Sequence, residues 1–560
     1  MDGDRHNCLI ACDFTADSLA GLIANAATQP GVDVHALPPA QWRPLLDGQV
    51  SPSEGTQTVF LWGRPETLSA AFSRFLQYDD VAMDELYSDV DAFSDGVKRI
   101  SERVPTVLVA SLLIPPYVRG WGLLDLRNGC GVRNALMRMN MRLIDNLSKC
   151  SGVFILDASQ WIKSGDTAWD ASMWYLTKIP FSNSVFRLCG QDIQAALATI
   201  FGQTKKLVVL DLDDTLWGGI VGDVGWEQLR LGGHDPIGEA FVDFQKFLLT
   251  LKKRGILLAV VSKNEHLVAV EAMRRHPEMV LRLDDFVSLK INWNDKAQNI
   301  VEMLTELNLG APSVVFLDDN PFERSRVREA LPEILVPDLP ENKLHYARFV
   351  ASLSCFDMLN VSAEDRQRSQ MYIAEQKRNE LKRTTTLSPD EWLGSLNIRI
   401  QITQLLAEDF PRALQLLNKT NQMNLATRRF TESELTAWTK LASNRLWTIR
   451  VKDKFGDLGL VGVVGIAIDG TVARITDFVL SCRAFSRHVE RIMLRLAADA
   501  AKSSGCLSVV ARYEPTSKNK PCLEFFKRSG CMVVDEFVFS WNPLNIYPIP
   551  SGITVDGMTQ

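Results

Sequence analysis

The sequence of 560 residues contains no apolar run close to the roughly 20 residues that a membrane-spanning helix needs. Its first residues also lack the basic segment followed by an apolar segment that is typical of a secretory signal peptide. The composition is that of an ordinary globular protein, with 46% hydrophobic and 23% charged residues. We therefore expect a cytoplasmic protein without a membrane partner, whose length suggests about three or four domains.

The cysteines lack a pattern as well. The chain has ten of them, and they form neither a Cys-x-x-Cys pair nor a regular framework. Structural zinc and disulfide scaffolds usually show one of those arrangements. We expect reduced thiols that are mostly buried.

Residues 1–203 lack the residue set of a serine hydrolase. The first apolar run ends in Ala11-Cys12-Asp13 rather than in a Gly-Asp-Ser nucleophile turn, and we find no Ser/His/Asp set nearby. Apolar runs alternate here with amphipathic stretches, which predicts a doubly wound α/β domain. We expect a domain that resembles SGNH-like domains. We expect this domain to serve docking or structure. Its strand candidates are Cys8 to Asp13, Val59 to Trp62, Val104 to Leu112 and Gly152 to Asp157.

The most informative stretch of the sequence runs from Lys206 to Gly219. A short run of apolar, mainly β-branched residues ends in Asp211 and Asp213 and then breaks into glycines. This pattern predicts a buried parallel strand with carboxylates at its C-terminal edge. Because like charges so close together repel, we expect a bound Mg²⁺ there. With the metal in place, Asp211 is suited to attack phosphorus and Asp213 to act as acid and base. Alone, the same motif is more typical of a solvated turn.

Two later segments supply groups suited to a phosphate. The apolar run from Leu257 ends in Ser262, Lys263 and Asn264, whose hydroxyl and amide suit phosphate oxygens. Lys296 follows at the start of a predicted helix, where its charge suits holding a phosphate against the nucleophile, and Lys290 is the alternative for this role.

A third segment completes the predicted metal site. The run from Ser313 ends in Asp318 and Asp319, which with Asp211 and Asp213 form an oxygen-rich Mg²⁺ site. This order of motifs resembles the haloacid dehalogenase (HAD) phosphotransferase superfamily. The spacings between the motifs leave no room for a large cap domain, so we expect a site open to a bulky substrate, such as a group carried on a protein arm.

The C-terminal region has the order of elements found in GNAT acetyltransferases. Ser388, Pro389 and Glu391 form a capping-box signature that starts a new helix and a new domain. Three strands, a helix, a strand, a helix and a strand then follow; their predicted ranges are 447–454, 460–468, 472–480, 489–502, 507–513, 521–529 and 532–541. This predicts a GNAT-like α+β domain.

The turn before the main helix of this domain differs from the GNAT pattern. In that fold a glycine-rich turn wraps the pyrophosphate of CoA, whereas this chain has Arg483, Ser486, Arg487 and His488 in the turn. A phosphopantetheine arm on a carrier protein therefore suits the cleft better. Cys482 precedes the turn, and the neighbouring cations would lower its thiol pKa and make it a nucleophile. The alternative is a small buried core residue.

Charge is distributed unevenly along the chain. Residues 396–541 hold 21 Lys and Arg but 14 Asp and Glu, although the whole chain has a net charge of −6. A basic region on an acidic chain favours an anionic partner such as an acidic carrier protein, and we do not expect a nucleic-acid partner. The alternative is an ordinary solvated surface.

Across nearly its whole length the chain resembles FkbH-like proteins, HAD subfamily IIIC. The resemblance rests on residues 210–219, 262–264, 276–280, 291–293, 316–324, 417–422, 455–459 and 481–483. The family often has Gly-Arg-Gly where this chain has Ser486-Arg487-His488.

The resemblance implies an enzyme of polyketide pathways. Such enzymes take the phosphoglyceryl group of 1,3-bisphosphoglycerate, remove its phosphate, and load a glyceryl thioester onto an acyl carrier protein. It implies Asp211 as nucleophile, Asp213 as acid/base, and Cys482 as a candidate acyl carrier. Ser262 and Lys296 would hold phosphate, and Asp318 and Asp319 would lie at Mg²⁺.

The sequence therefore predicts a bifunctional phosphatase and acyltransferase. The alternatives are a stand-alone Mg²⁺-dependent phosphatase and a non-catalytic scaffold that docks carrier proteins. The predicted division is 1–203 for the N-terminal domain, 204–340 for the HAD domain, 341–388 for a helical connector, 389–545 for the GNAT-like domain and 546–560 for a tail.

Overall fold

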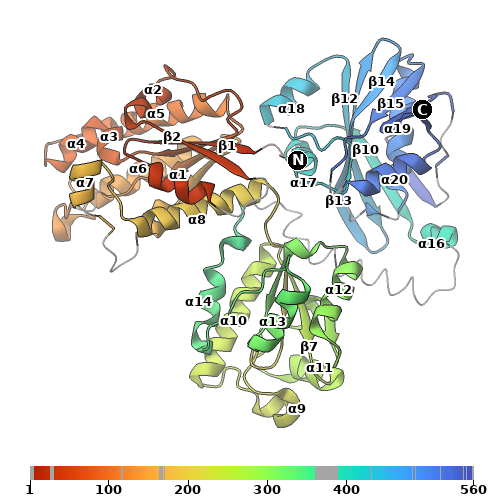
Figure 1. Ribbon diagram of the computed structural model, residues 1–560, viewed down its shortest axis with the longest axis horizontal. Helices are drawn as coiled ribbons and strands as arrows, with labels where there is room; N and C mark the ends of the chain where they lie inside the picture. The colour runs from red at the N-terminus through yellow and green to blue at the C-terminus, as the bar shows by residue number, and fades with distance from the viewer. Residues whose placement is uncertain are drawn as a thin grey trace. The chain divides into compact units, whose positions relative to one another are not determined.

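The structure is a computed structural model of the chain (Figure 1). It describes all residues except 1–4, 26–30, 115–117, 163–167, 170, 360–371, 373–388, 431, 482–483, 486, 517–518, 546–547, 550–551 and 558–560. The chain forms two compact units, Met1–Gly202 and Gln203–Gln560. Among the described residues, none of the helices combines the length and the apolar character needed to cross a membrane.

The first unit is built on a parallel sheet with strand order β2-β1-β3-β4-β5. The strands are β1 (His6–Cys12), β2 (Val32–Leu37), β3 (Thr58–Trp62), β4 (Thr106–Ala110) and β5 (Val153–Leu156). The larger helices are α1 (Asp17–Ala24), α4 (Ala70–Leu76), α5 (Met83–Ser101), α6 (Val132–Leu147) and α8 (Asn183–Ile200).

Both faces of this sheet are buried. On one face alternate strand residues such as Val59 and Val107 share a core with α5 and α6. On the other face Ile10, Phe60 and Leu108 are also fully buried. Burial on both faces explains why these strands are almost continuously apolar, and it makes the unit doubly wound, as predicted.

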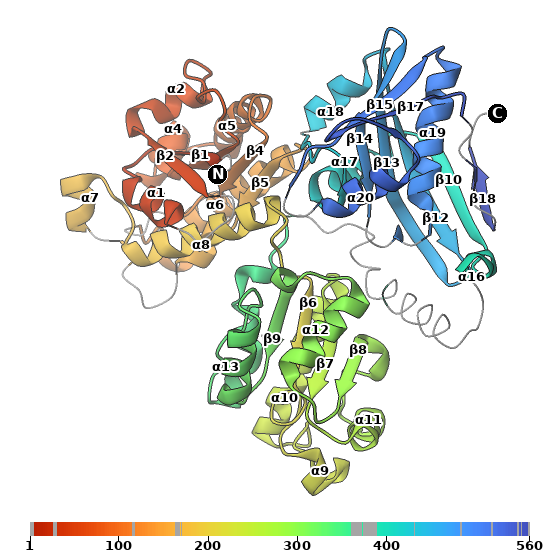
Figure 2. The ribbon, with the colours of Figure 1, turned by 45° about the vertical axis from the view of Figure 1, so that its right-hand side comes forward.

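The second unit begins with another parallel sheet, of order β8-β7-β6-β9 (Figure 2). Its strands are β6 (Leu207–Leu210), β7 (Leu257–Ser262), β8 (Phe286–Ile291) and β9 (Val314–Leu317). Its helices are α9 (Val221–Val224), α10 (Pro236–Lys253), α11 (His266–Arg275), α12 (Lys296–Leu307), α13 (Pro321–Ala330) and α14 (Tyr346–Ala351).

Helices cover both faces of the second sheet too. Phe241 and Phe244 of α10 pack on one face, together with Tyr346 of α14. Ile300 and Met303 of α12 pack on the other. Between β6 and β7 the chain forms only α9, a short 3-10 turn and α10, and between β8 and β9 it forms α12 and a short 3-10 turn. Within 204–340, all of which the structure describes, the carboxyl edge of the sheet therefore carries no large cap.

The rest of the second unit contains a mainly antiparallel sheet of order β16-β17-β15-β14-β13-β12-β10-β18. The strands are β10 (Ile398–Gln404), β12 (Asn444–Asp453), β13 (Gly456–Asp469), β14 (Val472–Leu480), β15 (Ser508–Arg512), β16 (Met532–Asp535), β17 (Val538–Trp541) and β18 (Ile553–Asp556), with β11 (Met423–Asn424) beside β14. The helices are α16 (Pro389–Ser395), α17 (Phe410–Lys419), α18 (Glu432–Thr439), α19 (Val489–Ser503) and α20 (Lys520–Arg528).

The strands β12 to β17 and the helices α19 and α20 follow the GNAT-like order that the sequence predicts, with β14 and β15 running parallel. Two details differ. The predicted strand 532–541 is a hairpin of β16 and β17. The predicted tail 546–560 contains β18, which pairs in parallel with β10. A strand of four residues between unpatterned segments has too short an alternation to be recognised from sequence.

Candidate functional site

The register of the second sheet brings two predicted site residues together. β6 and β9 are parallel neighbours in which Leu210 lies opposite Leu317. The next residue of each strand is an aspartate, so Asp211 and Asp318 leave the sheet side by side at its carboxyl edge. The backbone N–H of Asp211 donates to the carbonyl of Leu317 at 3.0 Å and continues the pairing into the site.

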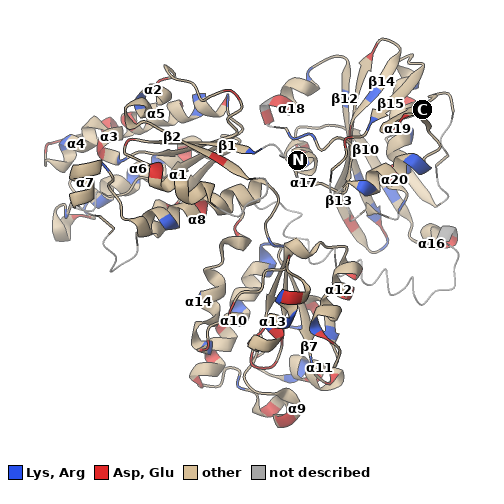
Figure 3. Cartoon of the chain, viewed as in Figure 1, with Lys and Arg blue, Asp and Glu red and all other residues tan. Residues whose placement is uncertain are grey.

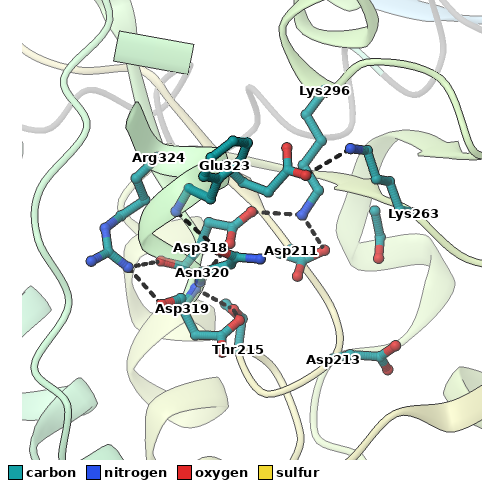
Figure 4. Close-up of polar contacts among 12 residues, drawn as sticks. Asp211, Asp213, Thr215, Lys263, Lys296, Asp318, Asp319, Asn320, Glu323 and Arg324 are labelled. Carbon is teal, nitrogen blue, oxygen red and sulfur yellow. Dashed lines mark hydrogen bonds and ion pairs between the residues drawn. The ribbon is translucent and has the colours of Figure 1, made fainter. Parts of the chain in front are cut away.

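Asp211, Asp318 and Asp319 form a carboxylate cluster (Figure 4). One oxygen from each lies within 4.8 Å of the others. Asp211 and Asp318 are buried and Asp319 is partly buried. Three hard anionic oxygens at one point are the ligand type that Mg²⁺ takes in proteins. The donor set therefore fits a magnesium ion.

Lys296 provides the cation of this cluster. Its ammonium donates to Oδ2 of Asp318 at 2.6 Å and lies 3.0 Å from Oδ1 of Asp211. Burial alone would lower the lysine pKa, but the two carboxylates outweigh burial, and the pKa lies above its ordinary value. Lys290, the alternative from the sequence, instead pairs with Glu306 at 3.0 Å.

Burial also shifts the pKa of Asp318, the carboxyl group in this contact. Together with the charge of Asp211, it raises the pKa of Asp318 to about 6, against the opposing effect of Lys296. A carboxyl group with this pKa ionises more readily when a divalent cation replaces the proton.

The side chain of Asp213, which the sequence also predicts at the metal, lies outside this carboxylate cluster. The strand ends at Leu210, and the chain turns at Asp214, directly after Asp213, with a φ of 53°. The Asp213 carboxylate accepts hydrogen bonds from Trp217 Nε1 at 2.8 Å and from Asn264 Nδ2 at 2.7 Å. Burial is the main reason that the pKa of Asp213 is raised.

The predicted phosphate-binding residues follow β7. Ser262 and Asn264 are buried, and Asn264 links to both Asp213 and the hydroxyl of Ser262. Lys263 points elsewhere, because its ammonium pairs with Glu323 at 2.7 Å. Ser262 and Asn264 are therefore at the site, whereas Lys263 is engaged at its margin.

Some residues of the site were given no role from the sequence. Thr215 Oγ accepts from the backbone N–H of Asp319 at 3.0 Å. Arg324 donates to the carbonyls of Asp318 and Asp319 at 2.9 and 2.7 Å and fixes that loop. Thr215 and Arg324 lie in the stretches that carry the family resemblance. No other feature of the sequence indicates a role for them. Lys343 contacts Asp214 and Asp319 and had no signal.

The predicted acyl site is described only in part. Cys482 and Arg483 lie outside the described residues. Arg487 is buried, 3.7 Å from the carboxylate of Asp453, and donates to the carbonyl of Phe485. It is expected to bind substrate and to act on Cys482, and the structure places its buried guanidinium beside Asp453, which supplies a counter-ion. His488 has a φ of 57° at the start of α19 and is partly exposed.

Basic residues occur on many elements of the C-terminal region, including β12, α19 and α20 (Figure 3). Several arginines are paired there with acids of the same region. Arg428 bonds Asp477 at 2.8 Å, Arg495 bonds Asp499 at 2.6 Å, and Arg450 pairs with Asp409.

Searches of protein-family models and of curated proteins found no match. Among solved structures, the chain is similar to the N-terminal part of the protein BF1531 from Bacteroides fragilis, which contains a phosphatase domain and is complexed with Mg. The two are 29% identical, the match covers 64% of this chain and 95% of that chain, and the TM-score is 0.58. Over nearly two thirds of its length, the chain is thus similar to a structure that contains a phosphatase domain.

Acetyltransferases are also matched. The spermidine/spermine N-acetyltransferase SpeG from Vibrio cholerae is 13% identical, with 26% of this chain and 94% of that chain covered and a TM-score of 0.21. The ribosomal-protein-S18-alanine N-acetyltransferase from Escherichia coli is 9% identical, with 26% and 93% covered and a TM-score of 0.19.

Proposed function

We propose that this protein removes phosphate from a short phosphorylated acyl unit at the Asp211 site and loads the resulting hydroxyacyl unit onto an acyl carrier protein. The observation that carries the proposal is the cluster of Asp211, Asp318 and Asp319 around Lys296, at a sheet edge without a large cap. The similarity to a phosphatase domain complexed with Mg supports the same chemistry.

In this proposal Asp211 attacks phosphorus, and the bond from phosphorus to the leaving oxygen breaks as an aspartyl phosphate forms. Asp213 gives its proton to the leaving oxygen and then takes one from the water that hydrolyses the aspartyl phosphate. The raised pKa of Asp213 suits a group that starts as the acid. Lys296, Ser262 and Asn264 hold the phosphate oxygens. Bound Mg²⁺ would offset the negative charge of the carboxylates and the phosphate.

The acyl half of the proposal concerns the C-terminal region. A thiol attacks the acyl phosphate of a donor such as 1,3-bisphosphoglycerate, so that a carbon–sulfur bond forms and inorganic phosphate leaves. Cys482 is the proposed first thiol. The phosphopantetheine thiol of the carrier protein then attacks the acyl carbon of that thioester, a new carbon–sulfur bond forms, and the Cys482 thiolate leaves. The GNAT-like order of elements and the surplus of basic residues in 396–541 support an acidic carrier partner. Arg483 and His488 are the proposed contacts for the pantetheine arm.

The test is intact-protein mass spectrometry of an acyl carrier protein incubated with the enzyme, Mg²⁺ and 1,3-bisphosphoglycerate. A mass increase equal to a glyceryl group supports the whole proposal. A phosphoglyceryl adduct would refute phosphate removal at the Asp211 site but not acyl loading. An unmodified carrier protein would refute acyl loading.

A stand-alone Mg²⁺-dependent phosphatase is the second candidate. The carboxylate cluster around Lys296 favours it, because phosphate release needs this site alone. This candidate predicts full turnover of small phosphate esters by a protein that loads no carrier.

A further inference from the structure

Lys343 reaches the phosphatase site from a segment that lies beyond residue 340, the predicted end of the HAD domain. It opens a short 3-10 turn, Lys343–His345, that precedes α14. Its ammonium lies 2.8 Å from Oδ1 of Asp214 and donates to the Asp214 carbonyl at 3.0 Å. The same ammonium lies 3.8 Å from Oδ2 of Asp319. One cation therefore contacts both the turn that follows Asp213 and a member of the carboxylate cluster.

Core packing fixes the place from which Lys343 reaches the site. Tyr346, three residues later, is buried, and its ring meets the rings of Phe241 and Phe244 edge to face, with centroid distances of 6.1 and 5.8 Å. The Lys343 ammonium itself lies 5.9 Å from the centre of the Phe241 ring. Only 22% of its side chain is exposed. Its position is thus set by the domain core and differs from that of a freely moving surface lysine.

The contacts of Lys343 complement those of Lys296. Lys296 contacts Asp211 and Asp318, and Lys343 contacts Asp319 and Asp214. Asp214 adopts a left-handed conformation, with a φ of 53°, which aspartate reaches more easily than most residues but which is still less favourable than the right-handed regions. The hydrogen bonds from Lys343 to the side chain and the carbonyl of Asp214 support this conformation.

We propose that Lys343 is a positioning residue with two effects on the phosphatase site. Its hydrogen bonds hold the Asp214 turn and thereby keep Asp213 in place. Its positive charge beside Asp319 opposes a second cation, which keeps bound Mg²⁺ exchangeable. The inference rests on the proposed phosphatase function and adds to it a residue outside the predicted motifs.

The two effects predict opposite changes when the charge is removed. Lys343→Met loses both the charge and the hydrogen bonds, whereas Lys343→Gln loses the charge and keeps a donor. We expect both variants to bind Mg²⁺ on the order of tenfold more tightly, because a repelling charge near the ligands is gone. We expect kcat to fall by on the order of tenfold in Lys343→Met, because Asp213 is no longer held, and to fall less in Lys343→Gln.

The experiment measures Mg²⁺ affinity by calorimetry on metal-free protein, and kcat with a small phosphate ester. The matched control is Lys246→Met, which removes the same charge from an exposed pair with Asp243 on α10. We expect this control to keep the wild-type affinity and kcat. If Lys343→Met does not fold, Lys343→Gln carries the affinity test.

Unchanged or weaker Mg²⁺ affinity in the charge-free variants would overturn the inference, as would an unchanged kcat in Lys343→Met. Failure of the wild-type protein itself to bind Mg²⁺ or to release phosphate would instead refute the proposed function, and the inference with it. Wild-type activity together with variants that match the wild type would refute the inference alone.

Discussion

The ammonium of Lys296 lies 2.6 Å from Oδ2 of Asp318, and both side chains are almost completely buried. The two residues are separated by 22 positions and come from the start of α12 and the end of β9. The same ammonium lies 3.0 Å from Asp211. An unpaired buried charge is costly, so loss of this contact should lower the stability of the folded protein as well as its activity.

Replacing Lys296 by Met should therefore affect both properties. We expect kcat for phosphate release to fall by on the order of 10²–10³-fold, because the charge that would hold the phosphate is gone. Without Mg²⁺ the protein should also unfold at a lower denaturant concentration, because two buried carboxylates lose their counter-ion. Steady-state kinetics and urea unfolding measure the two effects.

Lys290→Met is the matched control for this prediction. Its ammonium pairs with Glu306 and Glu302 of α12, away from the carboxylate cluster. We expect near wild-type kcat in this variant. Equal kcat losses at Lys290 and Lys296 would contradict the role given to Lys296.

The strand ends that carry the site could be predicted from the sequence. Apolar runs that stop at Asp211, Ser262 and Asp318 are short, strongly patterned and buried on both sides, so that sequence and structure agree to within a residue or two. The parallel order of those strands then places their carboxyl ends at one edge.

Other parts of the site depend on tertiary geometry that the sequence does not contain. Both Lys290 and Lys296 lie near a strand end, and only the packing of α12 decides which ammonium faces Asp318. The sequence places Asp213 near Asp211, but it does not show that the Asp213 carboxylate accepts hydrogen bonds from Trp217 and Asn264. Lys343 belongs to no motif, and its contact with Asp214 spans 129 positions.

Metal binding should depend on pH through Asp318. In the folded, metal-free protein its pKa is about 6, whereas in the unfolded chain it lies near the ordinary 3.8. Between these values the folded state holds a proton that the unfolded chain has released, so this group makes the metal-free protein less stable as pH rises through that window. Mg²⁺ binds the ionised form, and its stabilising effect should therefore grow over the same window.

The measurement for this prediction is the shift in melting temperature caused by a fixed Mg²⁺ concentration at about pH 5 and about pH 7.5, on either side of the Asp318 pKa. We expect a small shift at the lower pH and a larger one at the higher pH. Shifts of equal size would show that no ligand of the metal titrates in this range.

Arg487 should contribute to stability through its pairing with Asp453. Replacing it by Ala leaves a buried carboxylate without this counter-ion, so we expect the free energy of unfolding to fall by about 3 kcal/mol. Arg491→Ala is the control, because Arg491 is an exposed arginine four residues later, on α19. Equal stabilities of the two variants in urea unfolding would contradict the buried role of Arg487.

The proposed acyl carrier Cys482 predicts a distinctive serine variant. In Cys482→Ser the carrier protein should stay unloaded or the enzyme should hold a stable ester, because an alkoxide leaves far less readily than a thiolate. Intact masses of enzyme and carrier protein distinguish these results. Loading at the wild-type rate would show that the acyl group passes directly to the carrier thiol.

The central claim is that Asp211 is the nucleophile of a phosphatase site, and the most direct test is phosphate release by Asp211→Asn. The substitution removes the charge of the nucleophile at nearly constant volume, so the protein should stay folded. We predict that wild-type protein with Mg²⁺ releases inorganic phosphate from a small phosphate ester, and that the folded variant releases none. Phosphate release at the wild-type rate by folded Asp211→Asn would contradict the account.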